Sequence, residues 1–233
     1  MIPILELKEG FNLDDCKALT NHLSTVGFVY LKNHGISEEK IQSCKNIFLD
    51  FFAQDLDYKK SFCQALSNKH VGYKPHESER FNPTQKEKDM REALLFDAHD
   101  VASNEWPNEA FENTTSPLIQ ELGALADRLL HMLGIGLELE NPRVFAEAHS
   151  AFRQEKEADS VSFTTFRINL YPAIDASELK EDQVLCGEHA DFGTITLLIQ
   201  DHVPGLEVWF LAGRGMAVEG RGEWLLVFFL KFL

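Results

Sequence analysis

The residues best suited to chemistry are His189 and Asp191, which are separated by a single alanine. The run that follows at 194–200 is apolar and β-branched, which is typical of a buried strand. Residues two apart on an extended backbone point to the same face, so the imidazole and the carboxylate can converge on one point. Together they are two-thirds of the 2-His-1-carboxylate set that holds non-haem Fe(II) in oxygenases.

A third ligand is harder to find, because the only histidine after Asp191 is His202. An extended chain from His189 to His202 would span about 40 Å, so we expect His202 to lie away from any metal. An isolated His-x-Asp triplet is mostly accidental, with its histidine on the surface or hydrogen-bonded in a core. Here the strand that follows and Gly193 favour a ligand pair.

The composition excludes several classes of protein. The 233 residues suit one large domain or two small ones, and a hydrophobic content of 44% is enough for a sizeable core. A net charge of -15 argues against a nucleic-acid surface and against binding to anionic membranes. We expect neither partner.

The cysteines and the chain start point to a cytoplasmic protein. Cys16, Cys44, Cys63 and Cys186 are scattered without metal-site or disulfide spacing, which favours reduced thiols. The first residues lack the basic segment of a signal peptide. No run approaches the ~20 apolar residues that a membrane span needs.

Local patterns predict helices and short strands first, then a β-rich part. Helices are expected from Asn12 or Asp14, from Ser37, from Ser116 with Pro117 in the first turn, and from 141–142. The third should end near 134 or 136. Strands are expected over 2–7, 27–31, 92–96, 160–171 and 194–200. Residues 69–89 read as a long polar loop whose charge run is solvated.

The strand expected at 160–171 carries polar side chains at alternate positions. Thr165, Arg167, Asn169 and Tyr171 share one face, and Phe166, Ile168 and Leu170 share the other. The first face can therefore present an amide and a phenol together to a site.

Four segments in order carry a family resemblance: 27–36, 167–172 (Arg-Ile-Asn-Leu-Tyr-Pro), 186–201 and 205–208. Over about residues 2–209 the chain resembles the 2-oxoglutarate and Fe(II)-dependent dioxygenase superfamily, in its isopenicillin N synthase-like branch. The resemblance implies an α+β fold: an N-terminal helical region with short strands (1–110), then helices and first strands of a jelly roll, or double-stranded β-helix (111–209). A divergent apolar tail (210–233) follows, so the jelly roll is expected to be incomplete at its C-terminal end.

The resemblance also implies roles for four residues. His189 and Asp191 match the first two iron ligands, and Asn169 and Tyr171 match the Asn-x-Tyr positions that bind the 2-oxoacid or the substrate. The implied cofactors are Fe(II) and 2-oxoglutarate, with ascorbate as a candidate reductant. The implied reaction hydroxylates or desaturates a small molecule as 2-oxoglutarate is converted to succinate and CO₂.

The chain departs from the family pattern after Trp209. No second histidine ligand follows, and neither Arg214 nor Arg221 lies in the Arg-x-Ser that binds 2-oxoglutarate. Residues 210–222 are Gly-rich without strand alternation, and 224–233 are densely apolar. We therefore expect a truncated, inactive or weakly active form.

An alternative is a non-catalytic isoform that acts as a binding or interaction module. A cupin-like metal hydrolase or isomerase is a third option, which the helical N-terminal half disfavours. Without the later strands, the strand at 194–200 should keep at least one unpaired edge, which invites self-association. The apolar tail either fills part of that gap or adds exposed apolar area.

Overall fold

A computed structural model describes residues 1–63, 71–154, 164–175, 177, 180–181, 183–191, 193–210, 214–218 and 225–229. The chain divides into two compact units. The first comprises Met1–Glu38, Glu121–Ala151 and Asp191–Leu233, and the second comprises Glu39–Gln120 and Phe152–Ala190. The long helix α4 (Glu109–Gly136) contributes residues to both.

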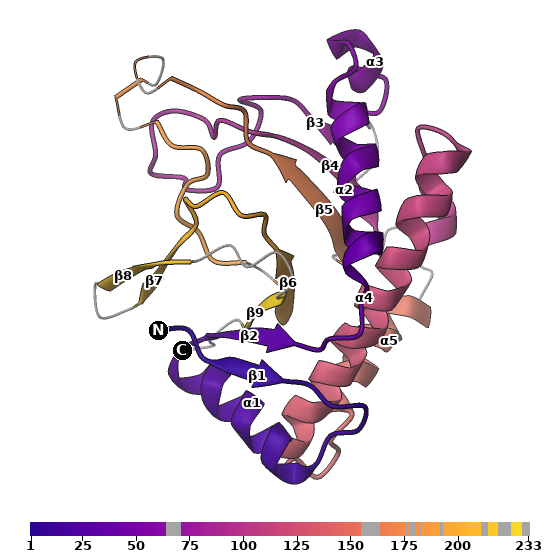
Figure 1. Cartoon of the computed structure of the whole chain (residues 1–233), viewed down its shortest axis with the longest axis vertical. Helices are drawn as coiled ribbons and strands as arrows, with labels where there is room; N and C mark the ends of the chain where they lie inside the picture. Colours follow the sequence, from indigo (N-terminus) through magenta and orange to yellow (C-terminus); the bar gives the residue numbers. More distant parts are fainter. Residues whose placement is uncertain are drawn as a thin grey trace. The chain divides into compact units, whose positions relative to one another are not determined.

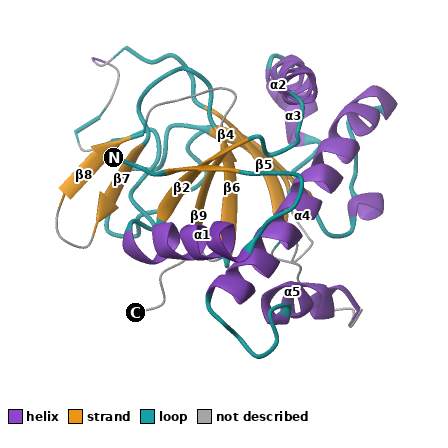
Figure 2. Cartoon of the chain, turned by 60° about the horizontal axis from the view of Figure 1, so that its bottom comes forward, coloured by secondary structure: helices purple, strands orange, loops and turns teal. Residues whose placement is uncertain are grey.

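The first unit is built on a four-stranded sheet in the order β1-β2-β9-β6. β1 (Ile4–Glu6) pairs in parallel with β2 (Phe28–Lys32), whereas β9 (Leu225–Phe229) runs antiparallel to both β2 and β6 (Ile195–Ile199). Helix α1 (Leu13–Thr25) packs against β1 and β2, and Figure 2 shows it lying along the sheet beside β2. Most of helix α5 (Val144–Gln154) also belongs to this unit, which includes its residues up to Ala151.

A hairpin of β7 (Glu207–Phe210) and β8 (Arg214–Ala217) lies in the same unit (Figure 1). Val208 and Val218 are buried with Ile2, Tyr30 and Leu226 in one apolar cluster. This contact attaches the hairpin to the sheet. The strand β8 corrects the sequence analysis, which found no strand alternation in 210–222.

The position of β9 resolves what the apolar tail does. Residues 225–229 lie in the middle of the sheet, where Leu225, Leu226 and Val227 are buried. An apolar run without alternation is what a strand needs when both of its faces are covered. Of the two expected outcomes, filling the gap is therefore the one observed for these residues.

The expected open edge is also observed. β6 is the last strand of its sheet among the described residues, so one of its edges has no strand partner there. Self-association through that edge remains a prediction.

The second unit contains a three-stranded antiparallel sheet in the order β3-β4-β5. Its strands are β3 (Gly72–Lys74), β4 (Glu92–Asp97) and β5 (Thr165–Leu170). Its helices are α2 (Glu38–Phe52) and α3 (Leu56–Lys60), with the 3-10 turn Val101–Ser103 and the first part of α4.

Aromatic packing holds the helices of this unit to its sheet. The ring of Phe48 on α2 lies 4.6 Å from that of Phe111 on α4, and 6.0 Å from the rings of Phe96 on β4 and Phe166 on β5. The apolar stripe expected on the second helix is thus buried in a core. Edge-to-face pairs of this kind add stability beyond their buried area.

Most helix ends follow the sequence signals. Asn12 caps α1, because its side-chain oxygen accepts from Asp15 N at 2.9 Å while Asp15 accepts from Asn12 N at 3.1 Å. Helix α4 ends at Gly136 as expected, but its predicted start at Ser116-Pro117 is wrong. It starts at Glu109, where Asn108 Oδ1 accepts from Phe111 N at 2.9 Å, and Pro117 lies inside it.

The earlier start of α4 has a physical reason. Starting at Glu109 lets the buried Phe111 join the aromatic core, which offsets the one helical hydrogen bond that Pro117 cannot make. None of the helices that the structure describes is both long enough and apolar enough to span a membrane.

Replacing Leu225 tests the assignment of β9 to the centre of the sheet. Leu225 is 0% exposed, so Leu225→Ala should lower the free energy of unfolding by about 2–5 kcal/mol. The matched control is Val203→Ala, at a position 68% exposed, which should change it by less than about 0.5 kcal/mol. Urea unfolding followed by circular dichroism measures both. If Leu225→Ala changed the free energy of unfolding as little as Val203→Ala does, the assignment of β9 to the core would be wrong.

Candidate functional site

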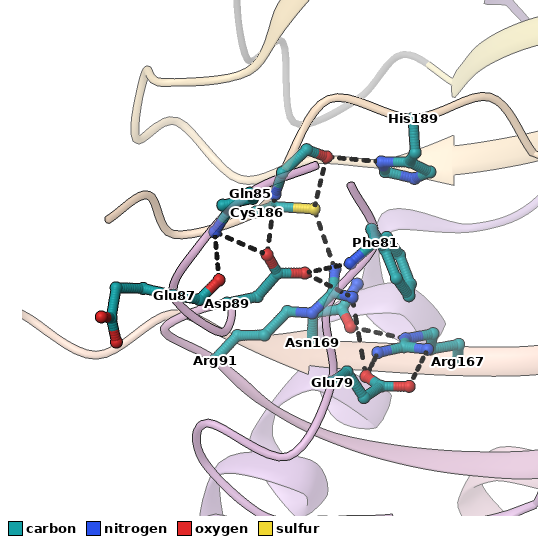
Figure 3. Close-up of polar contacts among 11 residues, drawn as sticks. Glu79, Phe81, Gln85, Glu87, Asp89, Arg91, Arg167, Asn169, Cys186 and His189 are labelled. Atoms are coloured by element: carbon teal, nitrogen blue, oxygen red, sulfur yellow. Dashed lines mark hydrogen bonds and ion pairs between the residues drawn. The ribbon is translucent and has the colours of Figure 1, made fainter. Parts of the chain in front are cut away.

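The imidazole of His189 is held by the backbone of its own loop. His189 lies in the second unit, between β5 and β6 in the sequence, and its Nδ1 is 2.8 Å from Gly187 O. A carbonyl oxygen only accepts hydrogen bonds, so Nδ1 carries a proton, and in the neutral imidazole the lone pair is then on Nε2. The Phe81 ring packs against the imidazole at 4.4 Å between centroids (Figure 3).

Asp191 is oriented by a different contact. The hydroxyl of Thr196, on β6, donates to Asp191 Oδ2 at 2.6 Å. Asp191 is the first residue of its segment in the first unit, whereas His189 belongs to the second. Both residues precede β6, which begins at Ile195, so the triplet is not part of that strand.

Asn169 and Arg167 lie on one face of β5, as the alternation predicts. Arg167 Nε donates to Asn169 Oδ1 at 2.6 Å. The Arg167 guanidinium also binds Glu79 through two nitrogens, one of them in an ion pair between Nη2 and Oε2. The amide of Asn169 is thereby held by the Arg167 guanidinium, which Glu79 holds in turn.

Tyr171 follows the end of β5. In the β4–β5 register Glu92 faces Leu170, so one further step brings Arg91 opposite Tyr171. Tyr171 is 44% exposed as a whole. Burial of its hydroxyl raises the pKa of Tyr171, and nearby Cys186 raises it further, while Arg91 acts in the opposite direction.

Sequence reasoning missed two buried charged residues that stand just before β4. The side chains of Asp89 and Arg91 are almost fully buried, with residue exposures of 1% and 3%, although the charge run that ends at Asp89 was expected to be solvated. Arg91 Nη1 donates to Cys186 Sγ at 3.0 Å, and its guanidinium lies over the Phe81 ring at 3.8 Å. An Asp-x-Arg pair leading into a predicted strand was the available signal.

The charges of this cluster are matched. Arg91 Nη2 lies 3.5 Å from a carboxylate oxygen of Glu79 and 3.5 Å from one of Asp89. Arg167 forms a further ion pair with Glu79. Two guanidinium groups thus face two carboxylates in a region that includes Asn169 and Cys186 (Figure 3). Buried charges persist only with such pairing.

The buried loop around Cys186 and Gly187 is closely packed. Gly187 N donates to Asp89 Oδ1 at 3.0 Å. A Cβ on Gly187 would lie 2.5 Å from Gln85 Oε1 and 3.0 Å from Asn82 N, so the close approach of the 82–85 turn calls for glycine. Within the described residues, no group of three or more His, Cys, Asp or Glu side chains is arranged to hold a metal ion.

Titration of Tyr171 tests the polar end of β5. Subtracting the phenolate absorbance of Tyr171→Phe from that of the wild type should show a phenol whose pKa lies above the ordinary value of about 10. Cys186→Ala should lower this pKa only partly, because burial is the larger cause. The folded state holds this proton more tightly than the unfolded chain. Its contribution to stability is therefore present below about pH 10 and lost as the pH rises through the raised pKa. A pKa of Tyr171 at or below about 10 would contradict the burial of its hydroxyl.

Comparison with known proteins gives consistent matches. Residues 2–113 match the family described as "non-haem dioxygenase in morphine synthesis N-terminal". A 2-oxoglutarate-Fe(II) type oxidoreductase of Metarhizium majus is 28% identical over 222 residues, covering 83% of this chain and 60% of the relative. Validamycin A dioxygenase of Streptomyces hygroscopicus is 28% identical over 235 residues, covering 89% of this chain and 60% of that protein.

Solved structures with the same fold include two bound to an oxoacid. A Neurospora crassa protein crystallised with alpha-KG has a TM-score of 0.80 at 23% identity, covering 97% of this chain and 72% of that one. The Arabidopsis thaliana dioxygenase for auxin oxidation 1, in its 2-oxoglutarate complex, has a TM-score of 0.74 at 20% identity, covering 98% and 79%. The predicted α+β fold with a partial set of jelly-roll strands is confirmed.

This chain spans about 60% of the length of each of these two curated relatives. The family match, the relatives and the fold agree with the motifs found at 27–36, 167–172 and 186–201. In sequence and in fold the chain is similar to members of the 2-oxoglutarate and Fe(II)-dependent dioxygenase superfamily.

Proposed function

We propose that this chain is part of a non-haem Fe(II) and 2-oxoglutarate-dependent oxygenase that acts oxidatively on a small molecule. The observation that carries the proposal is the hydrogen bond from His189 Nδ1 to Gly187 O, because it leaves Nε2 as the nitrogen able to bind a metal. Metal-binding histidines usually donate their other nitrogen to a carbonyl or carboxylate in this way.

The residues present fit Fe(II) in chemical type. His189 supplies a neutral imidazole, and Asp191 supplies a carboxylate whose Oδ2 accepts from Thr196, which orients it. Carboxylate oxygens have lone pairs for a metal as well as for this hydroxyl. Together they make one imidazole and one carboxylate of the facial triad that non-haem Fe(II) oxygenases use.

The polar end of β5 fits the 2-oxoacid or the substrate. Asn169 and Tyr171 offer an amide and a phenol, and a phenol is protonated at neutral pH, so that it can donate to an oxyanion. The pairing of Arg167 with both Glu79 and Asn169 fixes the amide before any ligand arrives. Preorganised donors of this kind lower the cost of binding.

When bound, Fe(II) and 2-oxoglutarate supply the oxygen-activating chemistry that converts the oxoacid to succinate and CO₂ and oxidises the substrate. The chain's own residues bind and orient the partners. A small-molecule substrate agrees with the names of relatives, such as Validamycin A dioxygenase, and with a Neurospora crassa structure that contains thymine beside alpha-KG.

Metal titration tests the ligand pair directly. With His189 and Asp191 as the ligand pair proposed among the described residues, this chain should bind Co(II) or Fe(II) anaerobically with a dissociation constant weaker than about 1 μM, or about −8 kcal/mol. His189→Ala should abolish this binding, and His202→Ala should leave it unchanged. Submicromolar binding lost in His189→Ala would show a third ligand within the chain. Binding that survives His189→Ala would overturn the assignment of His189.

Succinate release tests catalysis by this chain alone. The sequence has no Arg-x-Ser after Trp209 to hold the distal carboxylate of 2-oxoglutarate, and such a charge-assisted contact is hard to replace. Incubation with Fe(II), 2-oxoglutarate and ascorbate should therefore yield succinate at the background rate. If any turnover is measured, the Asp191→Asn variant tests whether it depends on Asp191, and the Asp201→Asn variant is the control. Sustained turnover that depends on Asp191 would contradict this expectation.

A further inference from the structure

We propose that Asp89 is the positioning residue for His189 and acts on it through the loop residue Gly187. The inference rests on the proposed role of His189 as an iron ligand and names what orients that ligand. Asp89 touches neither iron nor substrate in this proposal. It fixes the direction and the tautomer of the imidazole.

The first connection runs along the backbone of Gly187. Gly187 N donates to Asp89 Oδ1 at 3.0 Å, and Gly187 O accepts from His189 Nδ1 at 2.8 Å. The two bonds use peptide groups on either side of one α-carbon. Their coupling is therefore geometric: the carboxylate holds the amide end of Gly187, which sets where its carbonyl points.

The second connection runs through Phe81. Asp89 Oδ2 accepts from Phe81 N at 3.2 Å, and the Phe81 ring meets the His189 ring at a centroid distance of 4.4 Å and an angle of 64°. One oxygen of Asp89 thus holds the segment whose side chain packs on the imidazole. The other oxygen holds Gly187, whose carbonyl accepts from the imidazole of His189 (Figure 3).

Asp89 is itself firmly fixed. Its side chain is 0% exposed, and Arg91 Nη2, on a side chain 2% exposed, lies 3.5 Å from its Oδ2. Arg91 in turn lies over the Phe81 ring at 3.8 Å, so its guanidinium contacts both the carboxylate and the ring. The absence of a Cβ on Gly187 lets the 82–85 turn close over the loop.

The consequence is that His189 is prepared before any metal binds. A carbonyl can only accept, so the Gly187 contact requires a proton on Nδ1 and leaves the lone pair on Nε2. In the neutral imidazole free in water, both tautomers are accessible. Holding one of them removes an ordering cost from metal binding.

The test compares Asp89→Asn with the wild type in two measurements. Asp89→Asn is nearly isosteric, but its NH₂ cannot accept, so one of the two backbone contacts to Gly187 N and Phe81 N is lost. The first measurement is the ring ¹H–¹⁵N correlation spectrum of the metal-free protein at about pH 8, above the ordinary histidine pKa of about 6.5. The His189 signals are assigned by their loss in His189→Ala. The second measurement is Co(II) titration.

The expected result is a single Nδ1-protonated tautomer in the wild type and a mixture of tautomers in Asp89→Asn. Co(II) affinity should fall by about 10- to 100-fold, as is usual when a partner that orients a metal ligand is removed. The matched control is Asp97→Asn. Asp97 is also a buried carboxylate, and it accepts from His99 N at 2.7 Å and Asp100 N at 2.9 Å in another turn of the same unit. It should change neither the tautomer nor the affinity.

The outcomes separate this inference from the proposed function. If the wild type binds Co(II) and Asp89→Asn matches it in both measurements, the positioning role is overturned while the iron assignment stands. If the wild type binds no Co(II) but only Asp89→Asn loses the Nδ1-protonated form, the iron assignment fails and the positioning role stands. A tautomer loss in Asp97→Asn as large as that in Asp89→Asn would also overturn the role.

A second variant decides the question if Asp89→Asn does not fold. Gly187→Ala keeps the Asp89–Arg91 pair but adds a Cβ that would lie 2.5 Å from Gln85 Oε1 and 3.0 Å from Asn82 N, so it presses on the 82–85 turn beside the carbonyl that holds His189. It should give the same mixed tautomers and weaker Co(II) binding. A single Nδ1-protonated tautomer and wild-type affinity in Gly187→Ala would show that this carbonyl does not position His189.

Discussion

The buried ion pair of Asp89 and Arg91 is the interaction on which the candidate site depends. Removing a carboxylate and a guanidinium from water is costly, and the 3.5 Å separation between Arg91 Nη2 and Asp89 Oδ2 does not by itself repay that cost. The pair persists because Asp89 also accepts from Phe81 N and Gly187 N, and Arg91 also donates to Cys186. Each of these contacts fixes a loop, so the pair specifies the shape of the site more than it adds stability.

The residues at the entry to β4 serve this arrangement and a second one on the opposite face of the chain. Successive residues of a strand point to opposite faces, so Arg91 and Glu92 serve different neighbours. Glu92 Oε2 accepts from Lys59 Nζ at 2.9 Å and from the Tyr73 hydroxyl, which ties α3 and β3 to β4. Burial and the adjacent Glu92 raise the pKa of Tyr73 well above its usual range. Both clusters therefore depend on the register of β4, and a shift of this strand by one residue would exchange them.

The sequence predicted local structure well because local structure has local causes. The Asn12 cap, the aromatic stripe of α2 and the shared face of Arg167 and Asn169 depend on residues a few positions apart. Burial of Asp89 depends instead on Gly187 and Arg91 together, and Gly187 is 98 positions away. A polar loop looks the same in sequence whether its charges are solvated or paired with distant groups. The start of α4 was missed for a similar reason, since the core contact of Phe111 outweighed the signal at Pro117.

The central place of β9 could not be found from pattern either. An apolar run of β-formers fits a buried strand and an exposed sticky tail equally well, and only its pairing with β2 and β6 distinguishes them. The candidate ligands likewise combine a feature that the sequence predicts with one that depends on distant contacts. His189 was identifiable by its spacing from Asp191, but its tautomer follows from a carbonyl two residues away that a distant carboxylate holds in place. Asp191 is oriented separately, by Thr196 on β6. Each of the two candidate ligands is therefore oriented by contacts within its own unit, His189 by Gly187 and Asp191 by Thr196.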